Sequence, residues 1–186
     1  MKKLAALMTV LVIFTGCTGK RNEMDRVMNL RATLLGSEGC SFTAHIVADY
    51  GDTLQEFTLY CEGTNEGNLG FRVEKPESIS GITGRFRGEK GELTFEDVAL
   101  TFPLLADGQV APVSGPWILL KTLLGGYLTA CGMEDDLLRL TIYDSYEEDA
   151  LQMEIWLNDE NLPVQAEIIY DGRRILTMEI ENFQIR

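Results

Sequence analysis

The chain has 186 residues and a formal net charge of −13 at pH 7, from 16 lysines and arginines against 29 aspartates and glutamates. Such a charge argues against a nucleic-acid partner and against attraction of the whole protein to anionic lipid, because both ligands are negatively charged. The length suits one domain with its own hydrophobic core, and the sequence gives no sign of a second domain.

The N-terminus has the pattern of an export signal. Two lysines follow Met1, and residues 4–14 form an apolar run that one threonine interrupts. This run is too short to span a bilayer core, which takes about 20 apolar residues. We therefore expect residues 1–16 to be a cleaved secretory signal peptide.

The end of this run, Thr15-Gly16-Cys17, resembles the lipobox of bacterial lipoproteins. The resemblance implies a diacylglycerol group on the Cys17 sulfur, cleavage between Gly16 and Cys17, and acylation of the new amino group with a fatty acid such as palmitate. Two acyl chains anchor a protein stably, whereas one does not. The alternatives are an ordinary signal peptide in which Cys17 is incidental, or an uncleaved anchor.

Cleavage would remove Lys2 and Lys3 and leave a mature chain with a net charge of −15. With so acidic a chain, the lipid on Cys17 would have to hold the protein at the membrane. We expect residues 17–23 to form a tether and residues 24–186 to form the domain. The anchored protein should face outward from the cell membrane, and Thr18 after Cys17 would permit transfer to the outer membrane in a host that has two membranes.

Three further cysteines, Cys40, Cys61 and Cys131, belong to the predicted domain. An exported protein meets an oxidising or redox-neutral medium, so one disulfide is conceivable and one thiol must remain. A hairpin that turns at residues 51–52 would bring Cys40 near Cys61, and buried free thiols are the alternative. Metal-ligand spacing is absent from the cysteines, and the chain has a single histidine, so we expect no metal site.

The first predicted element of the domain is an amphipathic helix at residues 24–35, ended by Gly36. Its Met-rich apolar stripe should face the core, or else a groove or a partner. From residue 40 the apolar residues alternate with a period of two. We expect strands at 40–50, 53–61, 69–74 and 79–87. Within 93–102 the apolar positions change phase near residues 96–97, which indicates a bulge or a break.

Residues 103–115 have the composition of an irregular loop, and residues 127–132 fit no clear pattern. Between them, residues 117–124 are apolar on nearly all sides, which predicts a short buried helix that ends at Gly125-Gly126. The last fifty residues alternate again, at 138–142, 151–157, 164–170 and 176–180. Short turns join these strands, as in an antiparallel meander with one buried face.

Together these elements predict an α+β fold. About nine strands should form a strongly curved antiparallel sheet, an open half-barrel, with the N-terminal amphipathic helix and the short apolar helix covering its concave face. Nothing in the pattern suits a parallel α/β fold, because the strands follow one another through short turns.

The element order and four short stretches resemble the lipoprotein-carrier superfamily of LolA, LolB, LppX and RseB. The stretches are FRVEKP at 71–76, LQMEIWLN at 151–158, NLPV at 161–164 and MEIENF at 178–183. The concave-face arginine of that family has no match that we can assign, and LolA itself is not acylated. The acylated GerS-type lipoproteins of sporulation and germination, understood as partners of a peptidoglycan amidase, are similar in kind.

The resemblance implies that the concave hollow holds a hydrophobic ligand, either an acyl chain or a lipoprotein. The side chains expected to line this hollow are Phe42, Ile46, Trp117, Leu120 and Leu124, although each is also a plausible core residue. The helix at 117–124 would be a lid over the hollow, or a permanent plug that leaves no ligand site.

The alternative is a GerS-type interaction module with a filled hollow, which docks a cell-wall enzyme through an edge strand or an acidic face. Exposed sheet edges would also allow a homodimer. We expect no enzyme activity, catalytic residue or cofactor. The acidic residues at 135–136 and 147–149 lie in predicted turns, and His45 has the position of an ordinary strand residue.

Overall fold

The computed structural model describes residues 18–51, 53–88, 90–95, 98–103, 105–106, 109–147 and 150–186. The predicted signal peptide, its cleavage site at Gly16 and the predicted lipidation site Cys17 lie outside the described residues. The helices and strands, in chain order, are α2 (Thr18–Gly36), β1 (Gly39–Asp49), β2 (Leu54–Thr64), β3 (Leu69–Lys75), η1 (Glu77–Ile79), β4 (Thr83–Arg87), β5 (Lys90–Phe95), β6 (Val98–Pro103), β7 (Leu105–Ala106), β8 (Gln109–Val110), η2 (Pro112–Ser114), α3 (Gly115–Gly125), β9 (Tyr127–Glu134), β10 (Leu137–Tyr143), β11 (Gln152–Leu157), β12 (Pro163–Tyr170) and β13 (Arg173–Ile185).

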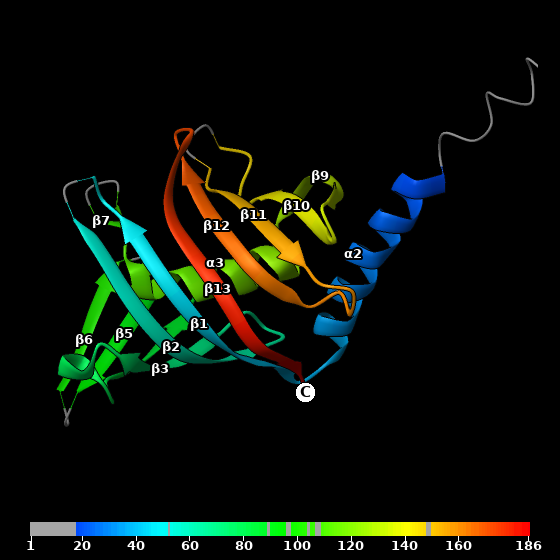
Figure 1. Cartoon of the computed structure of the whole chain (residues 1–186). Helices are drawn as coiled ribbons and strands as arrows, with labels where there is room; N and C mark the ends of the chain where they lie inside the picture. Colours follow the sequence, from blue (N-terminus) through cyan, green and yellow to red (C-terminus); the bar gives the residue numbers. More distant parts are fainter. Residues whose placement is uncertain are drawn as a thin grey trace, which may run out of the picture.

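One 11-stranded sheet dominates the fold, in the order β6-β5-β4-β3-β2-β1-β13-β12-β11-β10-β9. Every neighbouring pair in it is antiparallel. The sheet is strongly curved and remains open, with β6 and β9 as its two edges (Figure 1). Helix α3 lies across the concave side of this sheet (Figure 1), so the predicted α+β half-barrel is confirmed.

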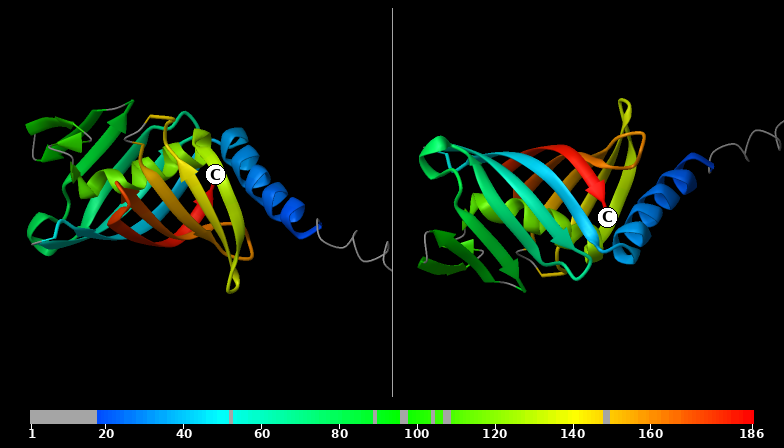
Figure 2. Two further views of the ribbon diagram at one scale, coloured as in Figure 1. Left: turned by 90° about the horizontal axis from the view of Figure 1, so that it is seen from above. Right: turned by 90° about the horizontal axis from the view of Figure 1, so that it is seen from below.

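Helix α2 packs beside β9 and near α3, at the end of the sheet where β9 forms the edge. Its N-terminal turns project beyond the body of the domain (Figure 2). The helix begins at Thr18, six residues before its predicted start, so residues 18–23 of the predicted tether are helical.

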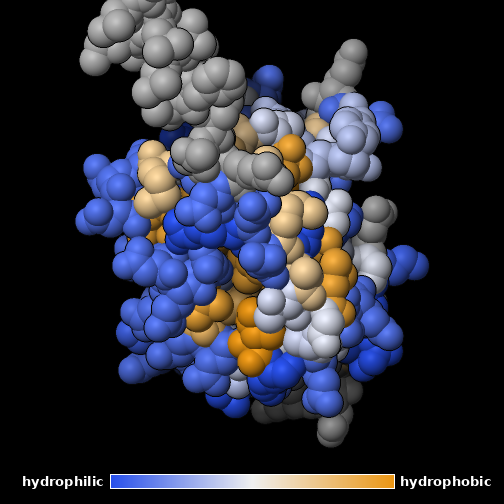
Figure 3. All heavy atoms as spheres, turned by 90° about the vertical axis from the view of Figure 1, so that its right-hand side faces the viewer, coloured by the Kyte–Doolittle hydropathy of each residue, from blue (hydrophilic) through white to orange (hydrophobic). Residues whose placement is uncertain are grey.

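The core lies between the concave face of the sheet and α3. Strand residues are buried at every second position, as the alternation predicted: Ala44, Ile46 and Ala48 of β1 each expose 1% or less of their surface. Helix α2 adds Val27, Leu30 and Leu34, which recur at helical spacing. The outer surface is mainly hydrophilic where the side bearing α2 faces the viewer, with apolar side chains gathered in places between the polar ones (Figure 3).

The phase change near residues 96–97 has a simple cause. Strands β5 and β6 form an antiparallel hairpin in which Phe95 pairs with Val98 and Lys90 pairs with Pro103. The chain therefore reverses at this point, and the two apolar phases belong to two strands. A similar hairpin joins β12 to β13 through Asp171 and Gly172, whose φ angles of 49° and 70° suit a type I′ turn.

Three predicted boundaries need correction. The strand expected at 79–87 begins only at Thr83, because the 3-10 turn Glu77–Ile79 follows the end of β3. The loop expected at 103–115 contains the short β7–β8 hairpin and η2. The unclear segment from residue 127 is the edge strand β9. These segments were hard to predict because each is short or half exposed, so its local periodicity is weak.

Candidate functional site

The concave side of the sheet, which we call the hollow, is occupied by α3. The helix is apolar on nearly all sides and must bury most of its surface. Eight of its residues are buried: Gly115, Pro116, Trp117, Ile118, Leu119, Leu120, Thr122 and Leu123. Only Lys121, Leu124 and Gly125 are partly or fully exposed. The amino-acid sequence of α3 therefore matches its place inside the curve of the sheet.

The five predicted lining residues come together, but as parts of one packed core. Phe42 and Ile46 each expose 1% of their surface, Leu120 exposes 2% and Trp117 exposes 4%. Leu124 is partly buried and packs against the same cluster. Side chains that contact one another in this way fill the hollow, and the expected wall of a ligand cavity is instead the interior of the domain.

The first turn of α3 is fixed to the sheet through Trp117. Its indole Nε1–H donates a hydrogen bond to the carbonyl oxygen of Gly67, in the turn between β2 and β3, at 3.0 Å. The ring stacks on Phe86 of β4 with 5.8 Å between ring centroids, and Lys121 Nζ lies 5.1 Å from the indole centroid. Buried indoles need a partner for their N–H, so this bond fixes both the place and the orientation of the side chain.

The middle of α3 approaches the sheet closely at Gly63 of β2. A Cβ atom at this position would lie 2.5 Å from Leu120 Cδ2, so a larger residue here would force the Leu120 side chain to shift. At the start of the helix, a Cβ on Gly115 would lie 3.1 Å from Met178 Sδ of β13. Helix and sheet are thus in direct contact along the length of α3, with packing as dense as a protein interior requires.

The C-terminal end of α3 is capped by Arg31 of α2. Its guanidinium donates to the carbonyl oxygens of Leu123 at 2.8 Å, Gly126 at 2.9 Å and Thr122 at 3.3 Å. The last carbonyls of a helix lack partners within the helix and carry partial negative charge, so a cation is well placed here. Burial lowers the pKa of Arg31. In the sequence, the only signal for this role of Arg31 is a charged residue beside the buried stripe of α2.

These contacts hold α3 at its first turn, its middle and its last turn. Among the described residues, every buried side-chain nitrogen or oxygen has a hydrogen-bond partner. The buried polar side-chain groups of the described interior are therefore all paired.

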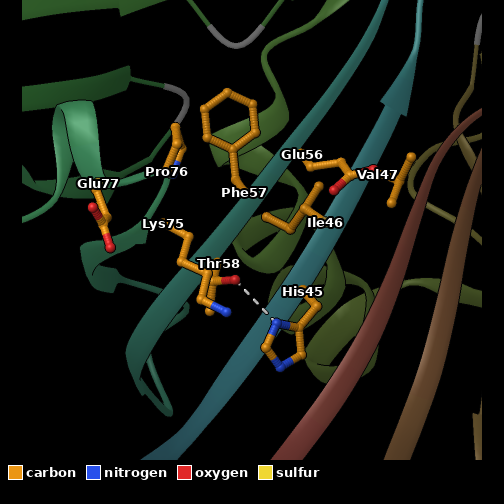
Figure 4. Close-up of a pocket in the computed structure, with 9 residues that line it drawn as sticks. All are labelled: His45, Ile46, Val47, Glu56, Phe57, Thr58, Lys75, Pro76 and Glu77. Atoms are coloured by element: carbon orange, nitrogen blue, oxygen red, sulfur yellow. Dashed lines mark hydrogen bonds between the residues drawn. The ribbon is translucent and has the colours of Figure 1, made fainter.

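A surface pocket of about 430 Å³ lies at the end of β3, between β1, β2 and the start of η1 (Figure 4). Its polar centre is His45, whose Nδ1 is 3.0 Å from Thr58 Oγ1 (Figure 4). On the other side of the ring, His45 Nε2 is 3.3 Å from Glu181 Oε2.

A hydroxyl, an imidazole and a carboxylate in this order could suggest a nucleophile and its base. The geometry gives a simpler reason for their contact. Thr58 is directly opposite His45 in the β1–β2 ladder, and Glu181 lies on β13, the other neighbour of β1. Thr58 exposes only 7% of its surface, and the nearby backbone N–H groups serve the ladder, so they cannot form an oxyanion hole. We interpret the three as cross-strand polar contacts.

The predicted Cys40–Cys61 disulfide is not formed, and both residues are free thiols in the core. In the β1–β2 register Cys40 pairs with Gly63, and Cys61 pairs with Phe42. The two cysteines are therefore diagonal neighbours, offset by two residues along the strands. Diagonal neighbours lie about 7–8 Å apart, beyond ordinary disulfide spacing. Burial raises the pKa of the Cys40 thiol to about 11 and that of Cys61 well above its usual value. Cys131 lies on β9 and is partly buried.

A polar network on the convex face, around Glu154 of β11, also escaped the sequence analysis. Glu154 exposes 2% of its surface although it faces away from the core. Its carboxylate accepts hydrogen bonds from Arg139 Nε at 2.9 Å, Thr141 Oγ1 at 3.0 Å and Gln152 Nε2 at 2.6 Å. The hydrogen bond to Glu154 raises the pKa of Arg139. The network joins β10 to β11, and its Arg139 and Thr141 also line an open surface pocket of about 460 Å³ together with residues 130–134 of β9.

The acidic residues expected in turns are where they were predicted. Asp135 and Asp136 are exposed in the β9–β10 turn, and Glu147 is exposed before β11, while residues 148–149 lie outside the described residues. Within the described ranges, no cluster of histidine, cysteine and acidic side chains could hold a metal ion. Over the same ranges, no helix is long and apolar enough to cross a membrane.

No protein-family model matches the chain, and no curated protein matches it. Similar solved structures include a LolA-superfamily protein from Nitrosomonas europaea, with 9% identity over 86% of this chain and 93% of that chain and a TM-score of 0.42. LppX from Mycobacterium tuberculosis has 10% identity over 87% and 93%, with a TM-score of 0.41.

A chain of the complex between the CwlD amidase and the GerS lipoprotein of Clostridioides difficile has 14% identity over 78% of this chain and 85% of that chain, with a TM-score of 0.43. The solved structures thus come from the groups that the sequence resemblance named. Similarities at these identities and TM-scores give no information on the function of this chain.

Proposed function

We propose that this chain is a lipid-anchored protein of the cell envelope that binds a protein partner on its outer surface. The observation that supports this proposal is the filled hollow. Helix α3 occupies the place where a carrier would hold an acyl chain, and three sets of contacts hold it there. Of the two functions that the sequence left open, the interaction module fits this geometry better than the carrier.

The energetic reason is the apolar area of α3. Admitting an acyl chain would require the helix to leave the sheet, which uncovers Trp117, Ile118, Leu119, Leu120 and Leu123. Exposing a large apolar side chain costs about 1.5–3 kcal/mol, so five of them cost roughly 7–15 kcal/mol. That is as large as the whole folding free energy of a typical domain, about 5–15 kcal/mol. A single acyl chain would cover only part of the uncovered surface.

The anchor in this proposal is Cys17, acylated after cleavage at Gly16. It would hold the domain on the outward face of the cell membrane, or of the outer membrane in a host that has two. Helix α2 starts at Thr18, directly after the anchor, so the domain would stand close to the bilayer. The rest of the chain is too acidic to bind the membrane by itself.

The partner surface in this proposal is an edge of the sheet. Strands β6 and β9 each have one strand neighbour in the described sheet, and an unpaired strand edge can accept an extended segment of another protein. Because α2 packs beside β9, the β6 edge is the more open of the two. The resemblance to GerS-type lipoproteins suggests a peptidoglycan enzyme of the envelope as the partner. A second copy of this chain is the other occupant that such edges allow.

Photo-crosslinking in the native host tests this proposal. A photoreactive amino acid would replace Leu100 of β6, exposed by 64%, or Thr129 of β9, and a matched control would replace Leu54 of β2, exposed by 69% but remote from either edge. We expect one discrete protein adduct from an edge position and none from Leu54, with mass spectrometry identifying a peptidoglycan enzyme. Equal adducts at all three positions, or adducts with lipid alone, would overturn the interaction module.

A further inference from the structure

Helix α2 carries a second apolar stripe, on a flank that does not touch the core. Met24, Met28 and Leu35 expose 39%, 50% and 52% of their surface. With 3.6 residues per turn, these three side chains fall within about 40° of one another around the helix axis. The buried residues Val27 and Leu34 lie on a neighbouring sector of the same helix. An amphipathic helix that served only the core would carry polar residues on this flank.

The exposed stripe has clear boundaries. On one side Arg31 separates it from the buried sector and reaches the end of α3. On the far side the exposed face is polar, with Asp25, Asn29 and Thr33. Single exposed apolar residues are common and need no explanation, but three aligned on one flank of a helix are a surface that favours an apolar medium. Apolar side chains are visible among polar ones where this side of the molecule faces the viewer (Figure 3).

The charge of α2 sets it apart from the rest of the mature chain. The helix has four basic residues against two acidic ones, which gives a net charge of +2, whereas residues 37–186 have a net charge of −17. Two of the basic residues, Lys20 and Arg21, stand in the first turn, next to the predicted lipid anchor. An anionic surface would attract this helix and repel the remainder of the domain, which fixes the side from which the domain can approach it.

The position of α2 in the chain identifies that surface. Its first residue, Thr18, follows Cys17 directly, so an acylated Cys17 would place the helix at the level of the lipid headgroups. At 1.5 Å per residue, Met24 lies roughly 10 Å and Leu35 roughly 26 Å along the helix from this point. A helix attached at one end to the bilayer meets the membrane at a high effective concentration, so even a weak apolar contact will form.

We propose that α2 lies along the bilayer surface, with Met24, Met28 and Leu35 inserted among the lipid headgroups and the first acyl carbons. This inference rests on the proposed lipidation of Cys17 and adds an orientation to it. The acyl chains keep the protein on the membrane, and the stripe decides which side of the domain faces it. The opposite, polar side of α2 and the acidic body then face away from the lipid.

Quenching of a fluorescent probe tests the orientation in the full-length acylated protein. In a Cys131→Ser background, one variant carries bimane at Met28→Cys and the matched control carries it at Thr33→Cys, on the polar side of the same helix. The buried Cys40 and Cys61 should not take up the label, because burial keeps them protonated and inaccessible. Each protein is reconstituted in phosphatidylethanolamine–phosphatidylglycerol vesicles that contain a nitroxide-labelled lipid.

We expect the probe at position 28 to be quenched by the nitroxide lipid at least threefold more than the probe at position 33. Aqueous iodide should show the reverse order. If the nitroxide lipid quenches both probes equally and iodide also quenches both, the proposal is overturned. The stripe would then be a contact surface for a protein partner or for a second copy of the chain. Flotation with vesicles separates the two claims. The unaltered protein should float and the Cys17→Ala variant should not, and equal flotation of both would show that the lipid anchor is wrong. Flotation of the unaltered protein alone, with equal quenching at both positions, refutes only the orientation.

A substitution gives a second readout that does not depend on labelling. Met28→Glu places a charge in the stripe at a position that is half exposed, so the fold should tolerate it. On vesicles we expect at least threefold faster amide exchange across residues 22–30 in Met28→Glu than in Thr33→Glu. Identical exchange in the two variants would contradict an inserted stripe.

Discussion

Replacing Arg31 by methionine tests most sharply whether α3 is a fixed plug. The substitution keeps a long side chain but removes the guanidinium that donates to Leu123, Gly126 and Thr122. The Thr122 carbonyl also accepts the Gly126 N–H at 2.8 Å, so it keeps a partner, and the other two carbonyls lose the bonds from Arg31. A hydrogen bond to a charged group contributes about 1.5–3 kcal/mol net, so the loss of two should cost roughly 3–6 kcal/mol.

The assay is urea unfolding of the domain, followed by intrinsic fluorescence, together with binding of an apolar dye in the absence of urea. Arg31→Met should lower the free energy of unfolding by the amount given above. It should also bind more dye, because a helix that has lost its C-terminal cap uncovers apolar surface more often. An unfolding free energy within about 0.5 kcal/mol of the unaltered protein, with no added dye binding, would refute the view that Arg31 fixes α3.

Arg26 provides the matched control. It lies on the same helix, and its guanidinium donates to Asn161 Oδ1 and to the carbonyl of Asn158, both in the β11–β12 turn. It also donates to Met133 Sδ of β9 at 3.7 Å, so Arg26→Met removes a cation and three hydrogen bonds without touching α3. We expect some destabilisation and no rise in dye binding. A rise as large as that of Arg31→Met would show that loosening α2, and not uncapping α3, exposes the hollow.

Three further predictions follow from the packing. Gly63→Ala should destabilise the domain by about 1–3 kcal/mol, because its Cβ would lie 2.5 Å from a side chain of α3, whereas Gly36→Ala has open space and should be near neutral in the same unfolding assay. Arg139→Met should cost roughly 1–3 kcal/mol in urea unfolding, since Glu154, which is only 2% exposed, loses its cation but keeps its bonds from Thr141 and Gln152; a loss below about 0.5 kcal/mol would contradict the structure. The Cys61 thiol, whose pKa is raised by burial, should resist iodoacetamide at pH 8 until the protein is unfolded, and rapid alkylation of the folded protein would count against its buried place.

The outline of the fold could be predicted because most of its strands carry local signals. In the last four strands every second residue is apolar over most of their length, and short turns join them, so their antiparallel pairing could be predicted from the sequence. The Asp171-Gly172 hairpin is an example, since a type I′ turn needs positive φ at both residues. The helix at 117–124 was equally clear, because a short segment that is apolar all round has to be buried.

The contents of the hollow could not be predicted in the same way. The sequence named the correct side chains, such as Phe42 and Trp117, but whether they line a cavity or fill it depends on how closely α3 approaches the sheet. That distance is set by Gly63 and by the reach of Arg31, two residues far from α3 in the chain. Edge strand β9 was unclear for a related reason, because its exposed side chains lack the alternation that burial imposes.

Native mass spectrometry of the intact protein tests the filled hollow most directly. The lipoprotein would be purified from its own membranes, released from detergent in the spectrometer, and weighed together with whatever remains bound to it. If α3 is a permanent plug, the mass should equal that of the chain from Cys17 onward plus its covalent acyl groups. An additional population heavier by the mass of one lipid would contradict the plug and support the carrier function, provided that gentle activation releases this lipid and that it is found again in the lipid extract.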